Sequence, residues 1–343
     1  MSSTKIRCGT QCLICDYPIH FDTYYGCSYN CRYCFANNKN KLSNIRPQNQ
    51  YNNVKRFIEG KRTVETNFCD WQIPLHWGGM SDPFQPCEKQ YKLSYEALKV
   101  FAETGYPVVI STKGKLCIES PYLELLKKCN VVMQISALCS KYDELEKGAP
   151  SFNERLSIIR ILSQNVKRVI VRCQPYIHDV FNDVFDNIKL FSECGAYGVT
   201  FEGMKFIKKQ SGLVKVGGDW VQPTNILKLD YSKFKNECHK NNLKFYCAEN
   251  RLRKMGDNLT CCGIDGLEDF GFVPNTFNCC HIINNDKNIK VTESMKTNGT
   301  ATVYHSLFQT GKMYRLIKEK SYFDMTKWVL ENKKEYINSV LKD

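Results

Sequence analysis

Gly26-Cys27-Ser28-Tyr29-Asn30-Cys31-Arg32-Tyr33-Cys34-Phe35 is the stretch on which the fold assignment depends, because it places three cysteines at the spacing C-x3-C-x2-C. Four thiolates would close an iron–sulfur cubane or a zinc site. Three thiolates leave one iron of a cubane with an open position, which can hold a substrate or a cofactor. The alternatives for the same residues are a zinc knuckle and three unrelated buried thiols. The spacing therefore predicts a metal site on Cys27, Cys31 and Cys34.

Apolar strands and amphipathic helices alternate outward from this stretch. Continuous apolar strands joined through helices predict a parallel sheet with right-handed crossovers. About six such units give a partial (β/α)6-type TIM barrel, whose active site would lie at the carboxyl ends of the strands. We expect strands at residues 21–25, 73–77, 108–113, 131–136, 168–174 and 197–201, and helices at 51–60, 89–103, 119–128, 151–163 and 180–193.

Three segments are predicted along the chain. Residues 21–210 would form the barrel, residues 1–20 a cysteine-bearing N-terminal segment, and residues 211–343 a mixed C-terminal extension with a cysteine cluster and terminal helices. Within the extension, residues 213–221 are typical of a β-hairpin with a Gly-Gly turn. A helix is expected at 231–240, a short strand at 243–247 and two amphipathic helices at 306–341.

A second motif follows the second expected strand and carries a family resemblance. It reads Gly78-Gly79-Met80-Ser81-Asp82-Pro83-Phe84-Gln85-Pro86-Cys87-Glu88-Lys89. Together with the cysteine spacing and the aromatic Tyr33, it resembles the radical S-adenosylmethionine (radical SAM) superfamily, and within it the group related to spore photoproduct lyase, often labelled DNA repair photolyase-like. Met80 departs from the acidic residue that is usual at its position. The resemblance covers residues 21 to about 203.

The resemblance implies a [4Fe-4S] cluster on Cys27, Cys31 and Cys34 that binds S-adenosylmethionine, cleaves it reductively and so abstracts hydrogen from a substrate. An electron donor such as flavodoxin or ferredoxin would supply the electron. Glycine at the end of the second strand would let the backbone approach the cofactor, because a Cβ would block it. The cofactor-binding residues expected on this basis are Tyr33, Gly78, Gly79, Ser81, Asp82, Lys113, Ser136 and Arg172.

Other polar residues have weaker assignments. Arg172 and Gln174 lie on one face of the fifth strand by period-two alternation and would point inward. His76, on an apolar strand, is more often a packed core histidine than a ligand. Cys139, just past the fourth strand, is a candidate hydrogen donor to a product radical, although a spare thiol is the more common interpretation.

A second metal site is predicted from the remaining cysteines. Cys8, Cys12 and Cys15 repeat the spacing C-x3-C-x2-C near the N-terminus, one thiolate short of a closed site. The best completion is Cys262, forming a second iron–sulfur cluster or a zinc site. Two ligands from each region, or a loose tail with spare thiols, are the alternatives. The other candidate ligands are Cys247, Cys261, Cys279 and Cys280.

Composition limits the class of protein. The chain has 343 residues, 43% of them hydrophobic, no apolar run long enough to span a bilayer and no secretory signal, so we expect a cytoplasmic protein that does not bind membranes. In a reducing compartment the 19 cysteines suggest metal binding instead of disulfides. The net charge of +13 is compatible with nucleic acid, and equally with a general richness in lysine.

Three functions remain open at this point. The first is a radical SAM lyase or modifying enzyme acting on nucleic acid or a nucleobase, which the resemblance and the basic charge favour. The second is a radical SAM enzyme that modifies a peptide or a small metabolite with the help of an auxiliary cluster, which the extra cysteines favour. The third is a zinc-binding nucleic-acid module, against which the barrel pattern argues.

Overall fold

A curved sheet of eight strands organises the part of the chain that the computed structural model describes, which is residues 7–8, 19–36, 44–48, 51–59, 74–216, 219–258, 260–267 and 270. The strand order is β1-β2-β5-β6-β7-β8-β9-β13. β1 is antiparallel to β2, and every other neighbouring pair is parallel. These strands are β1 (Arg7–Cys8), β2 (Ile19–Phe21), β5 (Leu75–Trp77), β6 (Val108–Thr112), β7 (Val131–Ser136), β8 (Arg168–Tyr176), β9 (Gly198–Gly203) and β13 (Lys244–Cys247).

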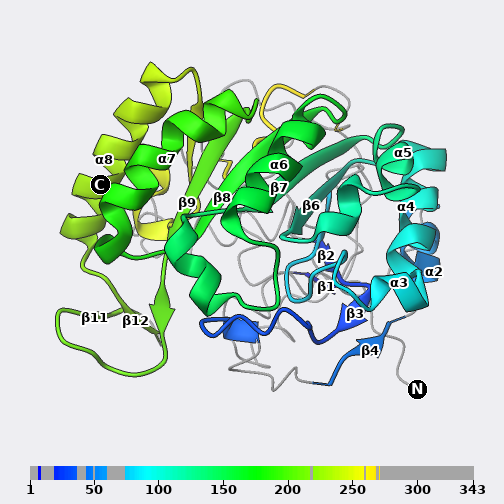
Figure 1. Cartoon of the computed structure of the whole chain (residues 1–343), viewed down its shortest axis with the longest axis horizontal. Coiled ribbons are helices and arrows are strands. Elements are labelled where there is room, and N and C mark those ends of the chain that lie inside the picture. Colours follow the sequence, from blue (N-terminus) through cyan, green and yellow to red (C-terminus); the bar gives the residue numbers. More distant parts are fainter. Residues whose placement is uncertain are drawn as a thin grey trace, which may run out of the picture.

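Helices follow one another along the outer face of this sheet (Figure 1). They are α2 (Tyr51–Ile58), α3 (Glu88–Tyr91), α4 (Leu93–Thr104), α5 (Tyr122–Leu126), α6 (Phe152–Ser163), α7 (Phe181–Glu193) and α8 (Thr224–Lys240). The short 3-10 helices are η1 (Lys115–Ile118), η2 (Ser140–Leu145), η3 (His178–Val180) and η4 (Asn250–Met255). Helices between parallel strands on one face give the partial TIM-barrel arrangement that the sequence predicts, so the predicted fold class is confirmed.

Two smaller antiparallel sheets stand at the rim. β3 (Tyr24–Tyr25) pairs with β4 (Arg46–Pro47). β10 (Lys205–Phe206), β12 (Asp219–Val221) and β11 (Val214–Val216) form a sheet in the order β10-β12-β11, which confirms the predicted hairpin. Figure 1 shows β11 and β12 projecting at the same edge of the molecule as the blue segment that contains the cysteine motif.

The sheet has an apolar core on each face, because successive side chains of a strand point to opposite sides. The large cluster lies under the helices and includes Val108, Ile110, Val131 and Phe201. A second, smaller cluster on the inner face joins Val109, Val132, Ile170 and Tyr246 to three residues of a segment that follows η4, namely Cys262, Ile264 and Phe270. Residues 260–267 and 270 therefore pack against the inner face of the barrel sheet.

The observed elements differ from the predicted ones in several places. The strand expected at 21–25 is β2, which ends at Phe21, and Tyr24–Tyr25 form β3 in another sheet. The expected helix at 89–103 is divided into α3 and α4 at Lys92, which has φ 53°. The short strand expected at 243–247 is β13, which pairs with β9, so the parallel sheet continues beyond residue 210. α8 begins at Thr224 instead of residue 231. The predicted terminal helices at 306–341 lie outside the described residues.

In the described part of the chain no helix is long and apolar enough to cross a membrane.

Candidate functional site

The cysteine motif forms a loop beside the carboxyl end of β2. Cys27, Cys31 and Cys34 are all partly exposed and form no disulfide. The backbone N–H groups of Tyr29 and Asp82 donate to Cys27 Sγ. Burial raises the pKa of the Cys27 thiol to about 12 and that of Cys31 to about 11. No three His, Cys, Asp or Glu side chains among the residues the structure describes converge as ligands of one ion, so the metal ligands remain a prediction.

Side chains of the second motif form hydrogen bonds with the backbone of this loop. Ser81 Oγ donates to the Gly26 carbonyl at 2.6 Å, and Gln85 Nε2 donates to the same oxygen at 3.1 Å. Gln85 Oε1 accepts from the Ser28 N–H at 2.8 Å. Gln85 is fully buried. Ser81 thus uses its hydroxyl to position the cysteine loop.

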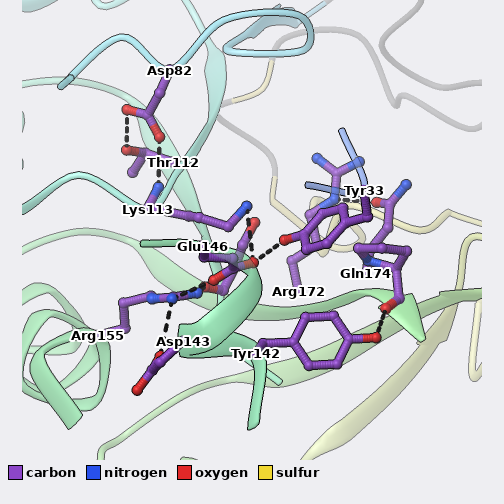
Figure 2. A network of polar contacts seen from close by, with 12 residues as sticks. Tyr33, Asp82, Thr112, Lys113, Tyr142, Asp143, Glu146, Arg155, Arg172 and Gln174 are labelled. Carbon is purple, nitrogen blue, oxygen red and sulfur yellow. Dashed lines mark hydrogen bonds and ion pairs between the residues drawn. The ribbon is translucent and has the colours of Figure 1, made fainter. Parts of the chain in front are cut away.

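Asp82 links the loop after β5 to the end of β6. Its carboxylate accepts from Thr112 Oγ1 at 2.7 Å and from the Lys113 N–H at 2.7 Å (Figure 2). It also accepts from the Phe84 N–H at 2.9 Å. Burial raises the pKa of Asp82, and these hydrogen bonds oppose the rise. Asp82 therefore fixes the backbone from which the Lys113 side chain extends.

Glu146, which sequence reasoning missed, joins the cysteine motif to the barrel. The Tyr33 hydroxyl donates to Glu146, the Lys113 ammonium lies 3.7 Å from Glu146 Oε1, and Arg155 forms an ion pair with the same carboxylate (Figure 2). Burial raises the pKa of Glu146 to about 6, with Arg155 acting in the opposite direction. No sequence signal marks Glu146, because it sits in an irregular segment; Arg155 is the residue after the capping-box glutamate of α6.

Lys113 lies beside the cysteine motif, close to the ring of Tyr33. Its side chain is 15% exposed and its ammonium is 5.8 Å from the centroid of the Tyr33 ring. Burial lowers the pKa of Lys113, while the neighbouring Cys31 and Asp82 raise it. Ser136 ends β7 nearby, and its carbonyl accepts from Arg155 Nη1 at 3.0 Å.

A row of polar side chains crosses the inner face of the sheet. Arg172 Nη1 donates to Ser111 Oγ at 2.8 Å and lies 3.4 Å from Gln134 Oε1, while Arg172 Nε donates to Gln174. Ser111 Oγ also contacts His76 Nε2 at 2.9 Å. Arg172 and Gln174 thus point inward as predicted from alternation.

His76 is part of this row and is not an isolated core histidine. His76 Nδ1 is 2.9 Å from Nδ1 of His20, its direct neighbour across the parallel pair β2–β5. Burial lowers the pKa of His76 well below its usual value, and the adjacent His20 and Arg172 act in the same direction. The ring is therefore neutral at neutral pH.

Gly78 and Gly79, which follow β5, are glycines for different structural reasons. Gly78 has φ +92°, and a Cβ there would lie 2.2 Å from the Ser111 carbonyl oxygen, so the neighbouring strand excludes any side chain. A Cβ on Gly79 would lie 3.3 Å from His20 Nδ1 and 3.5 Å from the His76 ring. Gly79 is therefore the one that faces the polar row.

Two of the predicted cysteines, Cys139 and Cys262, do not lie at this site. Cys139 is 2% exposed and belongs to the helix-facing core, so its role as a hydrogen donor stays a prediction without support from its position. Cys262 is buried in the inner apolar cluster, with its Sγ 3.1 Å from Thr260 Oγ1. Cys8 lies in β1, while Cys12, Cys15, Cys279 and Cys280 lie outside the described residues, so the second metal site also stays a prediction.

Comparisons of the sequence with known proteins match about half of the chain. No protein-family model matches the chain. An uncharacterised protein of Mycobacterium bovis is 25% identical over 195 residues, which are 53% of this chain and 57% of the relative. The chain thus spans little more than half the length of the curated relatives it matches.

Among solved structures, a mutant of spore photoproduct lyase superposes with a TM-score of 0.56 at 14% identity, over 72% of this chain and 79% of that one. A second mutant, with bound AdoMet and dinucleoside spore photoproduct, gives a TM-score of 0.53 at 15% identity, over 67% and 76%. The chain therefore shares the fold of spore photoproduct lyase over about two thirds of its length.

Proposed function

We propose that this chain, which shares the fold of spore photoproduct lyase, is a radical SAM enzyme with a [4Fe-4S] cluster on Cys27, Cys31 and Cys34. The observation that carries the proposal is the support of the cysteine loop by the second motif through Ser81, Gln85 and Asp82. The donor set fits the group, because the three cysteines lie in one loop, two backbone N–H groups donate to Cys27 Sγ and the Lys113 ammonium lies near Cys31.

Bound S-adenosylmethionine and a reduced cluster would supply a radical able to abstract hydrogen from a substrate. The chain supplies the position of that chemistry. Gln85 and Ser81 hold the loop, Asp82 orients the segment of Lys113, and Glu146 holds Tyr33 and Lys113 in place. Lys113, with Ser136 and Arg172 further along the same edge, offers cationic and hydroxyl groups that suit the carboxylate and ribose of the cofactor. Gly79 leaves room for its amino group.

Nucleic acid, or a nucleobase, is the substrate class that we propose. The sheet β10-β12-β11 follows directly after β9 and carries exposed lysines around Trp220: the ammonium of Lys209 is 5.6 Å and that of Lys215 is 6.0 Å from the ring centroid. Basic and aromatic side chains together suit a phosphate backbone and its bases. The net charge of +13 acts in the same sense, and the fold relative binds a dinucleoside. The finer parts of the proposal are a flavodoxin- or ferredoxin-like electron donor, a cytoplasmic location and a second metal site.

The test uses protein reconstituted anaerobically with iron and sulfide. With reductant it should convert S-adenosylmethionine to 5′-deoxyadenosine, and replacing Cys27, Cys31 and Cys34 together by Ala should abolish the product. Cys87→Ala, a half-exposed cysteine of the second motif, is the matched control and should retain it. Cleavage that persists in the triple variant contradicts the cluster assignment. Deuterium transfer into 5′-deoxyadenosine from labelled DNA or RNA, and not from labelled peptides, would identify the substrate class.

A further inference from the structure

The Lys113 ammonium is largely buried and is held by a long ion pair. Its side chain is 15% exposed, and its nitrogen is 3.7 Å from Glu146 Oε1, which is beyond hydrogen-bond distance. It also lies 5.8 Å from the centroid of the Tyr33 ring. Among the described residues, none accepts a hydrogen bond from this ammonium. Leaving the three N–H donors of a buried ammonium unused is costly, so the position suits the binding of an anion.

Glu146, the partner in this ion pair, is fixed by two other residues (Figure 2). Its side chain is fully buried: the Tyr33 hydroxyl donates to Oε1, and Arg155 forms an ion pair with Oε2. Arg155 is 1% exposed and is itself fixed, because its Nη1 donates to the Ser136 carbonyl at 3.0 Å. The carboxylate therefore has a fixed position, whereas the Lys113 ammonium can leave it without breaking a hydrogen bond.

The backbone of Lys113 is fixed, so only its side chain can move. Its N–H donates to a carboxylate oxygen of Asp82 at 2.7 Å. The ring that its ammonium approaches belongs to Tyr33, between Cys31 and Cys34. An ammonium that leaves Glu146 therefore remains beside the cysteine motif, because the length of a lysine side chain limits its reach. An anion bound by Lys113 would lie next to the proposed cluster.

The charges around Lys113 set up a competition between anions. Glu146 faces two cations, Lys113 and Arg155, and Arg155 also lies 3.5 Å from Asp143 Oδ1. Lys113, in contrast, has its one ion pair among the described residues with Glu146. An incoming carboxylate can pair with Lys113 only by drawing the ammonium away from Glu146. Binding is therefore weakened by the strength of that ion pair.

We propose that Glu146 is a positioning residue that pairs with Lys113 while the site is empty and releases it to the carboxylate of S-adenosylmethionine. The inference rests on the function proposed above and adds a competing anion to it. Tyr33 and Arg155 keep Glu146 in place during the exchange, so the same carboxylate can take the ammonium back when the ligand leaves. Glu146 therefore lowers the affinity for the cofactor and keeps Lys113 oriented beside the cysteine motif.

Calorimetry measures the affinity for S-adenosylmethionine, per bound cluster, of anaerobically reconstituted wild type, Glu146→Gln, Lys113→Met and the double variant. Glutamine keeps the shape of glutamate and an oxygen for the Tyr33 hydroxyl, but it does not compete for the ammonium. The affinity of Glu146→Gln should therefore rise about tenfold, because one partly buried ion pair no longer has to be broken. Lys113→Met should weaken binding, and adding Glu146→Gln to it should restore little, because no ammonium is left to compete for.

The ligand provides a second test, independent of the variants at Lys113. Decarboxylated S-adenosylmethionine lacks the group that draws the ammonium away, so wild type and Glu146→Gln should bind it equally. A purely structural role of Glu146 predicts a weaker affinity of Glu146→Gln for both ligands. Asp143→Asn is the matched control, because it removes a carboxylate that lies beside Arg155 and is 33% exposed; it should leave both affinities unchanged.

A melting curve of each variant without ligand establishes that it is folded, and Glu146→Met repeats the test if Glu146→Gln is not. An affinity of Glu146→Gln for S-adenosylmethionine that equals or falls below that of wild type overturns the inference. The same gain in the Lys113→Met background, or for the decarboxylated ligand, also overturns it. Wild type that binds S-adenosylmethionine while Glu146→Gln shows no gain refutes the competition alone, whereas wild type that binds none refutes the proposed function as well.

Discussion

Gln85 is fully buried, and three of its hydrogen bonds reach Ser81 and the backbone of the cysteine loop. Gln85→Leu would leave the Ser28 N–H without its acceptor and remove one of two donors to the Gly26 carbonyl. We expect a loss of roughly 2–4 kcal/mol of unfolding free energy and a clear fall in iron bound after reconstitution. Urea unfolding and iron analysis measure the two effects. Gln90→Leu, an exposed glutamine on α3, is the matched control and should change neither; a stable, iron-replete Gln85→Leu protein would contradict this role.

A single residue, Glu146, should make the unfolding free energy of the protein depend on pH. Its pKa of about 6 in the folded protein lies above the value of 4.5 for a free glutamate. Between these values the folded chain holds a proton that the unfolded chain has released. The stability from this group is therefore complete below pH 4.5 and is lost as the pH rises through 6, by about 2 kcal/mol.

Urea unfolding of wild type and Glu146→Gln between pH 4.5 and 7 checks this prediction. The stability of wild type relative to the variant should decrease across the window, because glutamine does not titrate. Glu144→Gln, whose parent side chain is 83% exposed, is the control for removing a carboxylate that lies outside this buried network. A constant difference for Glu146→Gln would show that this carboxyl does not titrate there.

At the scale of elements, the segment after η4 closes the inner face of the sheet through close packing. Arg168 Nη1 donates to the carbonyls of Gly263 and Asp265 at 2.9 and 2.6 Å. Gly263 has φ +75°, and a Cβ there would lie 2.4 Å from Ile170 Cδ1, which is enclosed in the inner cluster. The segment can pack this closely against the sheet only because residue 263 is a glycine.

Gly263→Ala should therefore destabilise the protein more than Gly266→Ala. Both positions have positive φ, so both variants carry the backbone cost, but a Cβ at Gly266 has no atom within 4 Å. The extra cost at Gly263 should be roughly 1–3 kcal/mol, the usual penalty for overpacking a core. Differential scanning calorimetry of the two variants measures it. Equal melting temperatures would mean that the segment does not pack on Ile170.

At the scale of elements, local sequence patterns predict the central strands well. β6 to β9 are apolar runs ending in polar residues, and the structure has them within a few residues of the predicted bounds. The break at Lys92 was missed because periodicity continues through Glu88–Thr104, while the buried Glu88 is held by side chains of Tyr24 and Tyr122 from distant segments. β13 was recognised as a strand, but its place in the sheet depends on pairing with β9, which sequence periodicity does not contain.

At the scale of the whole molecule, the candidate site was predictable where motif residues carry it and not where distant segments meet. Cys27, Lys113 and Arg172 follow from spacing, strand ends and alternation. Glu146 does not, because its importance comes from the residue that the fold places next to it, Tyr33. The motif residues Ser81 and Gln85 were recognisable by pattern, yet only the structure shows that they hold the cysteine loop.

The last prediction follows from the net charge of +13 and concerns how the whole molecule binds a polyanion. If nucleic acid binds over β10-β12-β11, the affinity must fall with salt because lysines displace counterions. Lys209 and Lys215 flank Trp220 at the exposed rim. Replacing both by Ala should make the slope of log K against log salt less negative by roughly 1.4 to 1.8, measured by fluorescence anisotropy on labelled single strands and duplexes.

Lys228→Ala with Lys240→Ala, on the exposed side of α8, removes the same charge elsewhere and should change the slope by far less. Equal changes in the two double variants would mean that the charge acts only through the general field of the protein, and that this rim does not dock nucleic acid.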